Sequence, residues 1–199
     1  MKRIPSPQRT AIVKYELSIF GKNDFEVNNY YNDNKTLSLE LLTVPDEIDE
    51  GMISIGTVGL SETALRDDEG AEFITRVELC AGAPKDEKEW CNFVISTAFK
   101  ILRTENAVMP GEVMENIIYE YFPDAKMPHI YLTVPFLWNE GHFPELLFSD
   151  VRINWLQCIA IHDSEKNFID EHGSAKFEDL LSKNDVNIFD KTRASVLDL

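Results

Sequence analysis

Residues 6–21 carry apolar side chains at the three- and four-residue spacing that is typical of a helix with one buried face. The segment begins with Ser6 and Pro7, a favourable cap and first helical residue, and it ends at Gly21. The same apolar residues could also alternate along a strand. Because the start and stop signals agree with each other, we predict an amphipathic helix.

Alternation of apolar and polar residues, with many β-branched side chains, predicts strands in five other segments. The last of the five is almost entirely apolar, so we expect it to lie in the centre of a sheet. These segments are residues 35–45, 52–60, 72–82, 129–138 and 152–162.

Helical spacing returns in residues 85–107, where acidic residues come first and one face is apolar. That face consists of Trp90, Phe93, Val94, Thr97 and Ile101. Residues 110–123 follow, and they read as a loop that enters a short helix or turn.

Two short helices are predicted for residues 163–173 and 174–183, joined at Gly173. Asp163 or Ser164 is the expected cap of the first helix, and Ser174 that of the second. With helices and strands interspersed, the fold class is predicted to be α+β, a mixed sheet flanked by helices. The length fits one domain over residues 1–199.

The net charge is strongly negative, at −16. Residues 40–90 hold 14 acidic and 4 basic residues, which gives that quarter of the chain a charge of −10. Such a surface repels nucleic acid and anionic membranes and attracts basic partners, although solubility alone could also explain it.

The three cysteines have no metal-ligand spacing and cannot complete a disulfide framework, so a reducing, cytoplasmic setting is expected. The basic N-terminus lacks the apolar stretch of a signal peptide.

The histidines give little support to catalysis. Metal ligands on a helix need a spacing of three or four residues, whereas His162 and His172 lie ten apart. His129 and His142 lie at strand or loop edges without a spaced carboxylate partner. We therefore predict no catalytic residues, no metal and no cofactor, and keep a small hydrolase built on His129, His142 or His162 as an alternative.

The tryptophans divide into two groups. Trp90 and Trp155 follow the apolar pattern of their segments and are expected in the core. Trp138 lies where a strand meets a long loop, so it could be a core residue or an anchor at an interface.

Several short motifs occur in one order and together resemble the suppressor-of-fused domain family. They are "ISIGTVGLSETAL" with its Gly-Leu-Ser segment, Glu78-Leu79 in "RVELCAGAP", a helix led by Trp90, the turn at Pro110-Gly111, the apolar strand with Gln157 before "DSEKNFIDEHGSAKFEDLL", and Arg193 and Ser195 near the end. The resemblance covers roughly residues 50–199, with the N-terminal helix as an addition.

The resemblance implies a binding protein and not an enzyme. Animal members of the family are scaffolds that bind a transcription factor, whereas a bacterial chain of this length resembles immunity proteins, the antitoxins of LXG-type toxins. The implied partner is a basic toxin C-terminal domain, such as a DNase or RNase, blocked in the cytoplasm at its active or substrate-binding site. The alternative is a scaffold that sequesters another basic protein or regulator.

Contact with such a partner is expected at exposed carboxylates, with Trp138 as a possible anchor, because acidic side chains complement a surface that binds nucleic acid. The expected carboxylates are Asp46, Glu47, Asp49, Glu50, Asp67, Asp68 and Glu69.

Overall fold

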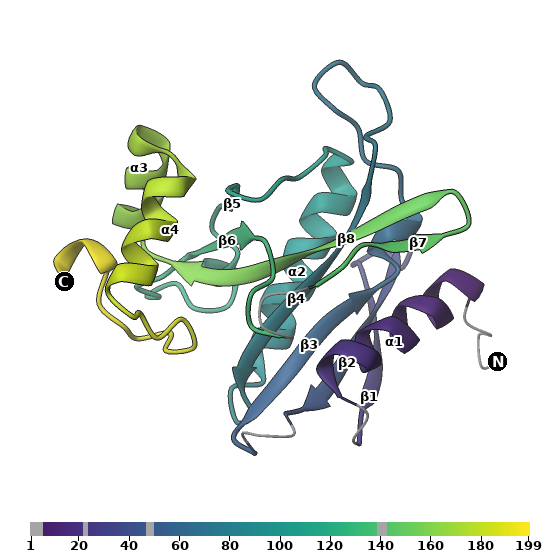
Figure 1. Ribbon diagram of the computed structural model, residues 1–199, viewed down its shortest axis with the longest axis horizontal. Coiled ribbons are helices and arrows are strands. Elements are labelled where there is room, and N and C mark those ends of the chain that lie inside the picture. The colour runs from purple at the N-terminus through teal and green to yellow at the C-terminus, as the bar shows by residue number, and fades with distance from the viewer. Residues whose placement is uncertain (1–5, 22–23, 47–49, 139–142) are drawn as a thin grey trace.

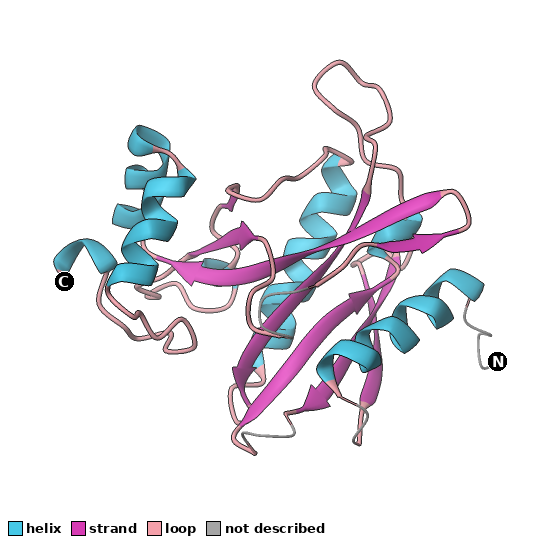
Figure 2. Cartoon of the chain, viewed as in Figure 1, coloured by secondary structure: helices cyan, strands magenta, loops and turns pink. Residues whose placement is uncertain are grey.

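The computed structural model describes residues 6–21, 24–46, 50–138 and 143–199. Helices and strands are interspersed along the chain (Figures 1 and 2). In order they are α1 (Pro7–Phe20), β1 (Glu26–Tyr31), β2 (Ser38–Pro45), β3 (Met52–Val58), the 3₁₀ helix η1 (Leu60–Glu62), β4 (Arg76–Pro84), α2 (Glu89–Thr104), β5 (Val113–Met114), η2 (Ile118–Glu120), β6 (His129–Thr133), β7 (Leu146–Phe148), β8 (Val151–Ile161), α3 (Asp163–His172), α4 (Ser174–Lys183) and η4 (Val196–Asp198).

The strands of the described residues form one eight-stranded sheet in the order β1-β2-β3-β4-β8-β6-β5, with β7 also paired to β8. The β4–β8 pair is parallel and the other pairs are antiparallel. This confirms the predicted α+β class with a mixed sheet. The long apolar strand β8 crosses the molecule in Figure 2 and has neighbours on both sides, as its sequence predicted.

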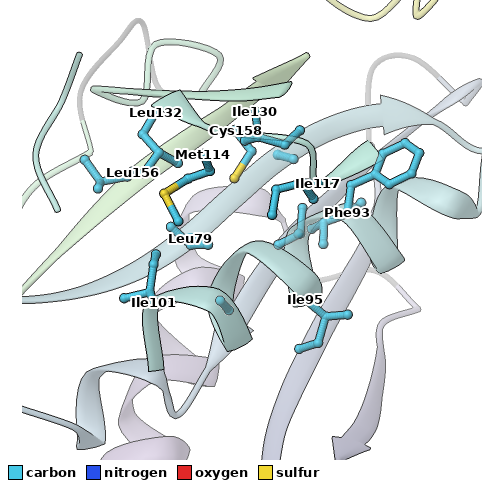
Figure 3. Close-up of a cluster of buried hydrophobic side chains, with 14 of the residues drawn as sticks. Leu79, Phe93, Ile95, Ile101, Met114, Ile117, Ile130, Leu132, Leu156 and Cys158 are labelled. Carbon is cyan, nitrogen blue, oxygen red and sulfur yellow. The ribbon is translucent and has the colours of Figure 1, made fainter. Parts of the chain in front are cut away.

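One face of the sheet is covered by α2. Figure 3 shows side chains from this helix, among them Phe93 and Ile101, packed against Leu79 of β4 and Leu156 of β8. Complete burial of a side chain of this size contributes roughly 1.5–3 kcal/mol. The predicted apolar face of α2, including Trp90, is buried as expected.

The opposite face is covered at two separate places. Trp155 of β8 contacts the cluster under α1, whereas Ile159 and Ile161 contact the cluster under α3 and α4. Gln157 lies between these places on the same strand and has no exposed surface. Its Oε1 accepts a hydrogen bond from the backbone N–H of Phe136 at 3.0 Å, so this buried amide fixes the chain that follows β6.

α1 forms as predicted. The Ser6 Oγ accepts a hydrogen bond from the Arg9 N–H at 3.1 Å, and Gly21 ends the helix with φ 110°. The helix buries Ile12 and Phe20 against the sheet, which excludes the strand alternative.

The structure corrects the predicted caps of the last two helices. His162 occupies the cap position of α3, and the Glu165 carboxylate accepts the His162 N–H at 3.0 Å. Gly173, with φ 86°, ends α3 and also occupies the cap position of α4, where Ser174 is the first helical residue. α3 begins directly after β8, and α4 begins directly after Gly173. Asp163, Ser164 and Ser174 are therefore helical residues and not caps.

The strands also differ from the prediction, and the short strands β5 and β7 were not predicted. β1 was missed because "EVNNYY" is polar, and it lies at the edge of the sheet with most of its residues exposed. The strand predicted over residues 129–138 ends at Thr133, because Pro135 cannot donate a hydrogen bond to the neighbouring strand.

None of the helices in the described residues has the length and apolar content that crossing a membrane requires.

Candidate partner-binding surface

The motif residues of β3 and β4 meet at one buried carboxylate. Glu78 accepts hydrogen bonds from the N–H groups of Gly59, Leu60 and Ser61 at 3.0–3.2 Å and from the hydroxyls of Thr57 and Ser61 at 2.6 and 2.7 Å. Burial raises the pKa of Glu78 to about 7, while the hydrogen bonds from Thr57, Ser61 and Gly59 act in the opposite direction. Glu78 therefore fixes the turn after β3 to the neighbouring strand, which is a structural role.

Arg9 fastens α1 to the same turn. Its guanidinium lies 2.9 Å from the Glu62 carboxylate and 3.5 Å from that of Glu40. A Cβ on Gly59, whose φ is 106°, would lie 2.7 Å from the guanidinium carbon. The turn therefore needs glycine both for its backbone conformation and for space.

Glu16 of α1 is a second buried carboxylate. Its Oε1 accepts a hydrogen bond from the Trp155 Nε1–H at 2.9 Å, while Oε2 has no partner among the described residues. Burial raises the pKa of Glu16 well above its ordinary value, and the nearby Glu78 acts in the same direction. Gly56 of β3 lies next to this carboxylate, and a Cβ on Gly56 would lie 2.5 Å from it.

Glu165 of α3 is also buried, but it faces a cation. Arg193 donates two hydrogen bonds to its carboxylate, at 2.6 and 2.8 Å, and the Val196 N–H donates a third at 2.8 Å. Burial opposes ionisation, yet Arg193 and the backbone donors lower the pKa of Glu165. This pair fastens the C-terminal segment, including Ser195, to α3 and β8.

The histidines have structural partners. The His129 Nδ1 accepts the Asn116 N–H at 3.0 Å, so its Nε2–H donates to Asp163 at 3.0 Å. The His162 Nε2 lies 3.0 Å from the Arg193 carbonyl oxygen. These bonds occupy both ring nitrogens of His129 and one of His162, and this arrangement does not favour the hydrolase alternative.

A metal site finds no support in the part of the chain that the structure describes. No group of three or more His, Cys, Asp and Glu side chains is placed there to hold a metal ion. His142 lies outside the described residues. The cysteines Cys80, Cys91 and Cys158 are free, in agreement with the predicted reduced thiols.

The predicted acidic contact residues do not form one face. Asp46 and Glu50 lie in the connection between β2 and β3, whereas Asp67, Asp68 and Glu69 lie in the connection between β3 and β4. These connections are at opposite ends of β3, about 20 Å apart at roughly 3.3 Å per residue (Figure 1). Glu47 and Asp49 lie outside the described residues.

The β3–β4 loop has only two of its acids free for a partner. The Asp67 Oδ1 accepts the N–H groups of Glu69 and Ala71 at 3.0 and 2.9 Å, which holds the turn together. Asp68 and Glu69 are exposed. Burial raises the pKa of Glu112, and the charge of Asp68 acts in the same direction.

Trp138 is a core residue in this structure. Its side chain is 8% exposed, its Nε1–H donates to the Ser54 Oγ at 2.7 Å, and its ring packs 5.0 Å from that of Phe20. A side chain that is buried in this way in the cluster under α1 has little exposed surface with which to contact a partner. Its burial therefore argues against the anchor role, whereas Trp90 and Trp155 are buried as predicted.

A groove beside α4 has a volume of about 530 Å³. We call it the α4 groove, and its walls come from the chain after β6, from α4 and from the segment after α4. Its main lining residues are Val134, Phe136, Glu178, Leu181, Asp185 and Ile188. Val134 is 59% exposed and Phe136 is 48% exposed, so an apolar rim faces solvent next to two carboxylates.

The sequence did not predict this groove. The segment "TVPF" was read as a continuous strand, although Pro135 could have indicated that the strand ends and leaves Val134 and Phe136 outside the ladder. No periodicity along the chain brings Thr133 next to Glu178, since this contact depends on where α4 returns to the sheet.

The family of the chain follows from comparison with known proteins. The family model described as suppressor of fused protein (SUFU) matches residues 35–194. The chain belongs to the suppressor of fused family. This confirms the resemblance seen in the motifs and extends it towards the N-terminus.

One relative aligns along almost its whole length. The Bacillus subtilis (strain 168) protein named immunity protein YqcF is 32% identical over 191 residues, which cover 96% of this chain and 97% of that protein.

Three solved structures share the suppressor of fused fold. A suppressor of fused homologue from Neisseria gonorrhoeae FA 1090 has a TM-score of 0.71 at 15% identity, with 95% of this chain and 96% of that chain covered. A chain of a Sufu–Fu complex has a TM-score of 0.70 at 14% identity, covering 98% and 94%. Drosophila Suppressor of Fused has a TM-score of 0.69 at 13% identity, with 98% of this chain covering 52% of that protein.

Proposed function

We propose that this chain is an immunity protein that binds a toxin domain and blocks its active or substrate-binding site in the cytoplasm of the producing cell. The observation that carries the proposal is the full-length similarity to immunity protein YqcF, at 32% identity with both chains covered almost completely. The partner we propose is the basic C-terminal domain of an LXG-type toxin, and a nuclease fits best.

The charge of the chain supports a nuclease as the target. A nuclease must present positive charge to its substrate, and a binder with a net charge of −16 complements that surface. Electrostatic steering raises the association rate, which matters when a few toxin molecules are lethal. Nanomolar affinity corresponds to about −12 kcal/mol, which a standard interface of roughly 1,600 Å² can supply.

The described structure supports binding more than catalysis. The buried carboxylates Glu78 and Glu165 are engaged in a turn and an ion pair, and His129 and His162 have structural hydrogen bonds. The solvent-facing features are instead an acidic loop and the α4 groove. We propose that Asp68 and Glu69 take part in steering, and that Asp46 and Glu50 belong to a separate acidic site at the other end of β3.

The experiment is co-expression of this chain with the C-terminal domain of the exported protein encoded next to its gene. We expect the cells to survive and the two proteins to co-purify as a stable complex. Cell death without a complex would overturn the immunity proposal and favour a scaffold that binds a different basic protein.

A further inference from the structure

The α4 groove contains a carboxylate that the fold holds in position. The Glu178 Oε1 accepts hydrogen bonds from the Tyr131 hydroxyl at 2.8 Å and the Thr133 hydroxyl at 2.7 Å. Both donors lie on β6 and point to the same face of the sheet, since they are two residues apart. The side chain of Glu178 is thus fixed before any partner arrives, although the residue lies at the surface.

The second oxygen of this carboxylate is available. Within the described part of the chain, the Glu178 Oε2 has no hydrogen-bond partner, and Glu178 forms no ion pair. Asp185, which also lines the groove, likewise has no cation beside it among the described residues. The groove therefore presents two uncompensated carboxylates next to an apolar rim.

The charge of the α4 groove differs from that of the other depressions described. No lysine or arginine lines the α4 groove. A second depression, beside η2, is lined by Lys126 and Lys191, and a third, between β1 and α2, is lined by Arg103. The α4 groove is thus the one that combines exposed apolar side chains with a purely negative lining.

The charge and the apolar rim of the α4 groove indicate what kind of partner it would bind. A second copy of this chain would bring another −16 of charge to an acidic groove, which opposes self-association. Arginine fits better than lysine, because its planar guanidinium can donate to the free oxygen of a fixed carboxylate and can also stack against an aromatic ring. Phe136 provides such a ring at the rim.

We propose that the α4 groove receives an arginine-bearing segment of the toxin domain, with the guanidinium on Glu178 and a neighbouring apolar side chain against Val134 and Phe136. This inference rests on the proposed function and names the surface that carries it out. The groove acts as the specific site, and the acidic loop contributes to the encounter.

The test compares two groove variants with two matched controls in the binding of the toxin domain encoded by the adjacent gene. Glu178→Gln keeps an acceptor for Tyr131 and Thr133 but removes the charge, and Phe136→Ala removes the ring. Asp179→Asn removes the adjacent charge on α4, which does not line the groove, and Phe25→Ala removes a ring of equal exposure, 47%, at the distant edge of the sheet. Thermal unfolding of all four verifies that they are folded.

We expect each groove variant to weaken binding at least about tenfold, mainly through faster dissociation, and each control to change it by less than about twofold. If the wild-type protein binds but the groove variants bind equally well, the groove inference is wrong while the immunity function stands. An equal loss in Asp179→Asn also overturns it, because the general negative field would then be responsible. If the wild-type protein does not bind, both proposals fall.

Discussion

Glu16 and Glu165 are both carboxylates with no exposed surface, yet their pKa values are shifted in opposite directions. Glu16 faces one indole N–H and no cation, so burial dominates and the folded protein favours its protonated form. Glu165 faces Arg193 and two backbone donors, so its charged form is favoured. The groups that surround a buried acid decide its charge, and burial alone does not.

The same comparison extends to the surface. Every oxygen of Glu165 is engaged in the scaffold, whereas Glu178, on the next helix, is held through one oxygen and presents the other. An acid of the first kind stabilises the fold, and an acid of the second kind is available to a partner. In a chain with 35 acidic residues, this distinction matters more than the net charge.

Removal of the cation beside Glu165 should have the largest effect. Arg193→Ala leaves a buried carboxylate without its partner, and we expect the free energy of unfolding to fall by about 3–5 kcal/mol. The matched control is Arg152→Ala, which breaks the exposed pair with Glu145 and should cost less than about 1 kcal/mol. Urea denaturation measures both, and equal losses would contradict the role given to the buried pair.

Glu16→Gln should change the pH dependence of stability. A raised folded pKa means that the contribution of Glu16 is complete below the unfolded value, near 4.5, and is lost as the pH rises towards the folded value. Glu165 has a lowered pKa, so its contribution to stability has the opposite pH dependence. It is complete above the unfolded pKa, near 4.5, and is lost as the pH falls below that value. We expect the variant to be less sensitive to pH than the wild type above about pH 5, by on the order of 1 kcal/mol per pH unit.

Denaturant titrations at several pH values measure this slope. Glu171→Gln, at an exposed position of α3, is the control and should leave the slope unchanged. Part of the wild-type slope should persist in Glu16→Gln, because the raised pKa of Glu78 acts in the same direction. A slope identical to that of the wild type would show that Glu16 is not buried in its protonated form.

Charge reversal in the β3–β4 loop should have the smallest effect on stability. Asp68→Lys with Glu69→Lys avoids Asp67, which holds the turn, so the free energy of unfolding should change by less than about 0.5 kcal/mol. We expect the association rate with the toxin domain to fall about three- to tenfold at low salt, and the difference to shrink at high salt. Stopped-flow mixing measures the rate, and an unchanged rate at low salt would exclude this loop from steering.

Local patterns predicted most of the fold. Ser6, Pro7 and Gly21 bounded α1, the apolar run predicted β8 as an interior strand, and the spacing around Trp90 predicted the buried face of α2. Each of these features is set by neighbours in the sequence. β1 was missed because a polar edge strand has no buried face to impose an alternating pattern.

The candidate site could not be predicted in the same way. Acids were chosen because they cluster in the sequence, but Asp46 and Asp67 lie at opposite ends of β3, and Trp138 is committed to the core. Glu178 looked like an ordinary residue of a surface helix. Its importance arises from Tyr131 and Thr133, which lie more than forty positions away and meet it only in the folded protein.

The most direct test is the affinity of this purified chain for the purified toxin domain of the adjacent gene, measured by isothermal titration calorimetry. A stoichiometric complex with nanomolar or tighter affinity, together with loss of the toxin's activity in the mixture, is the predicted result. Absence of binding, or binding that leaves the toxin fully active, would contradict the proposal that this chain is an immunity protein.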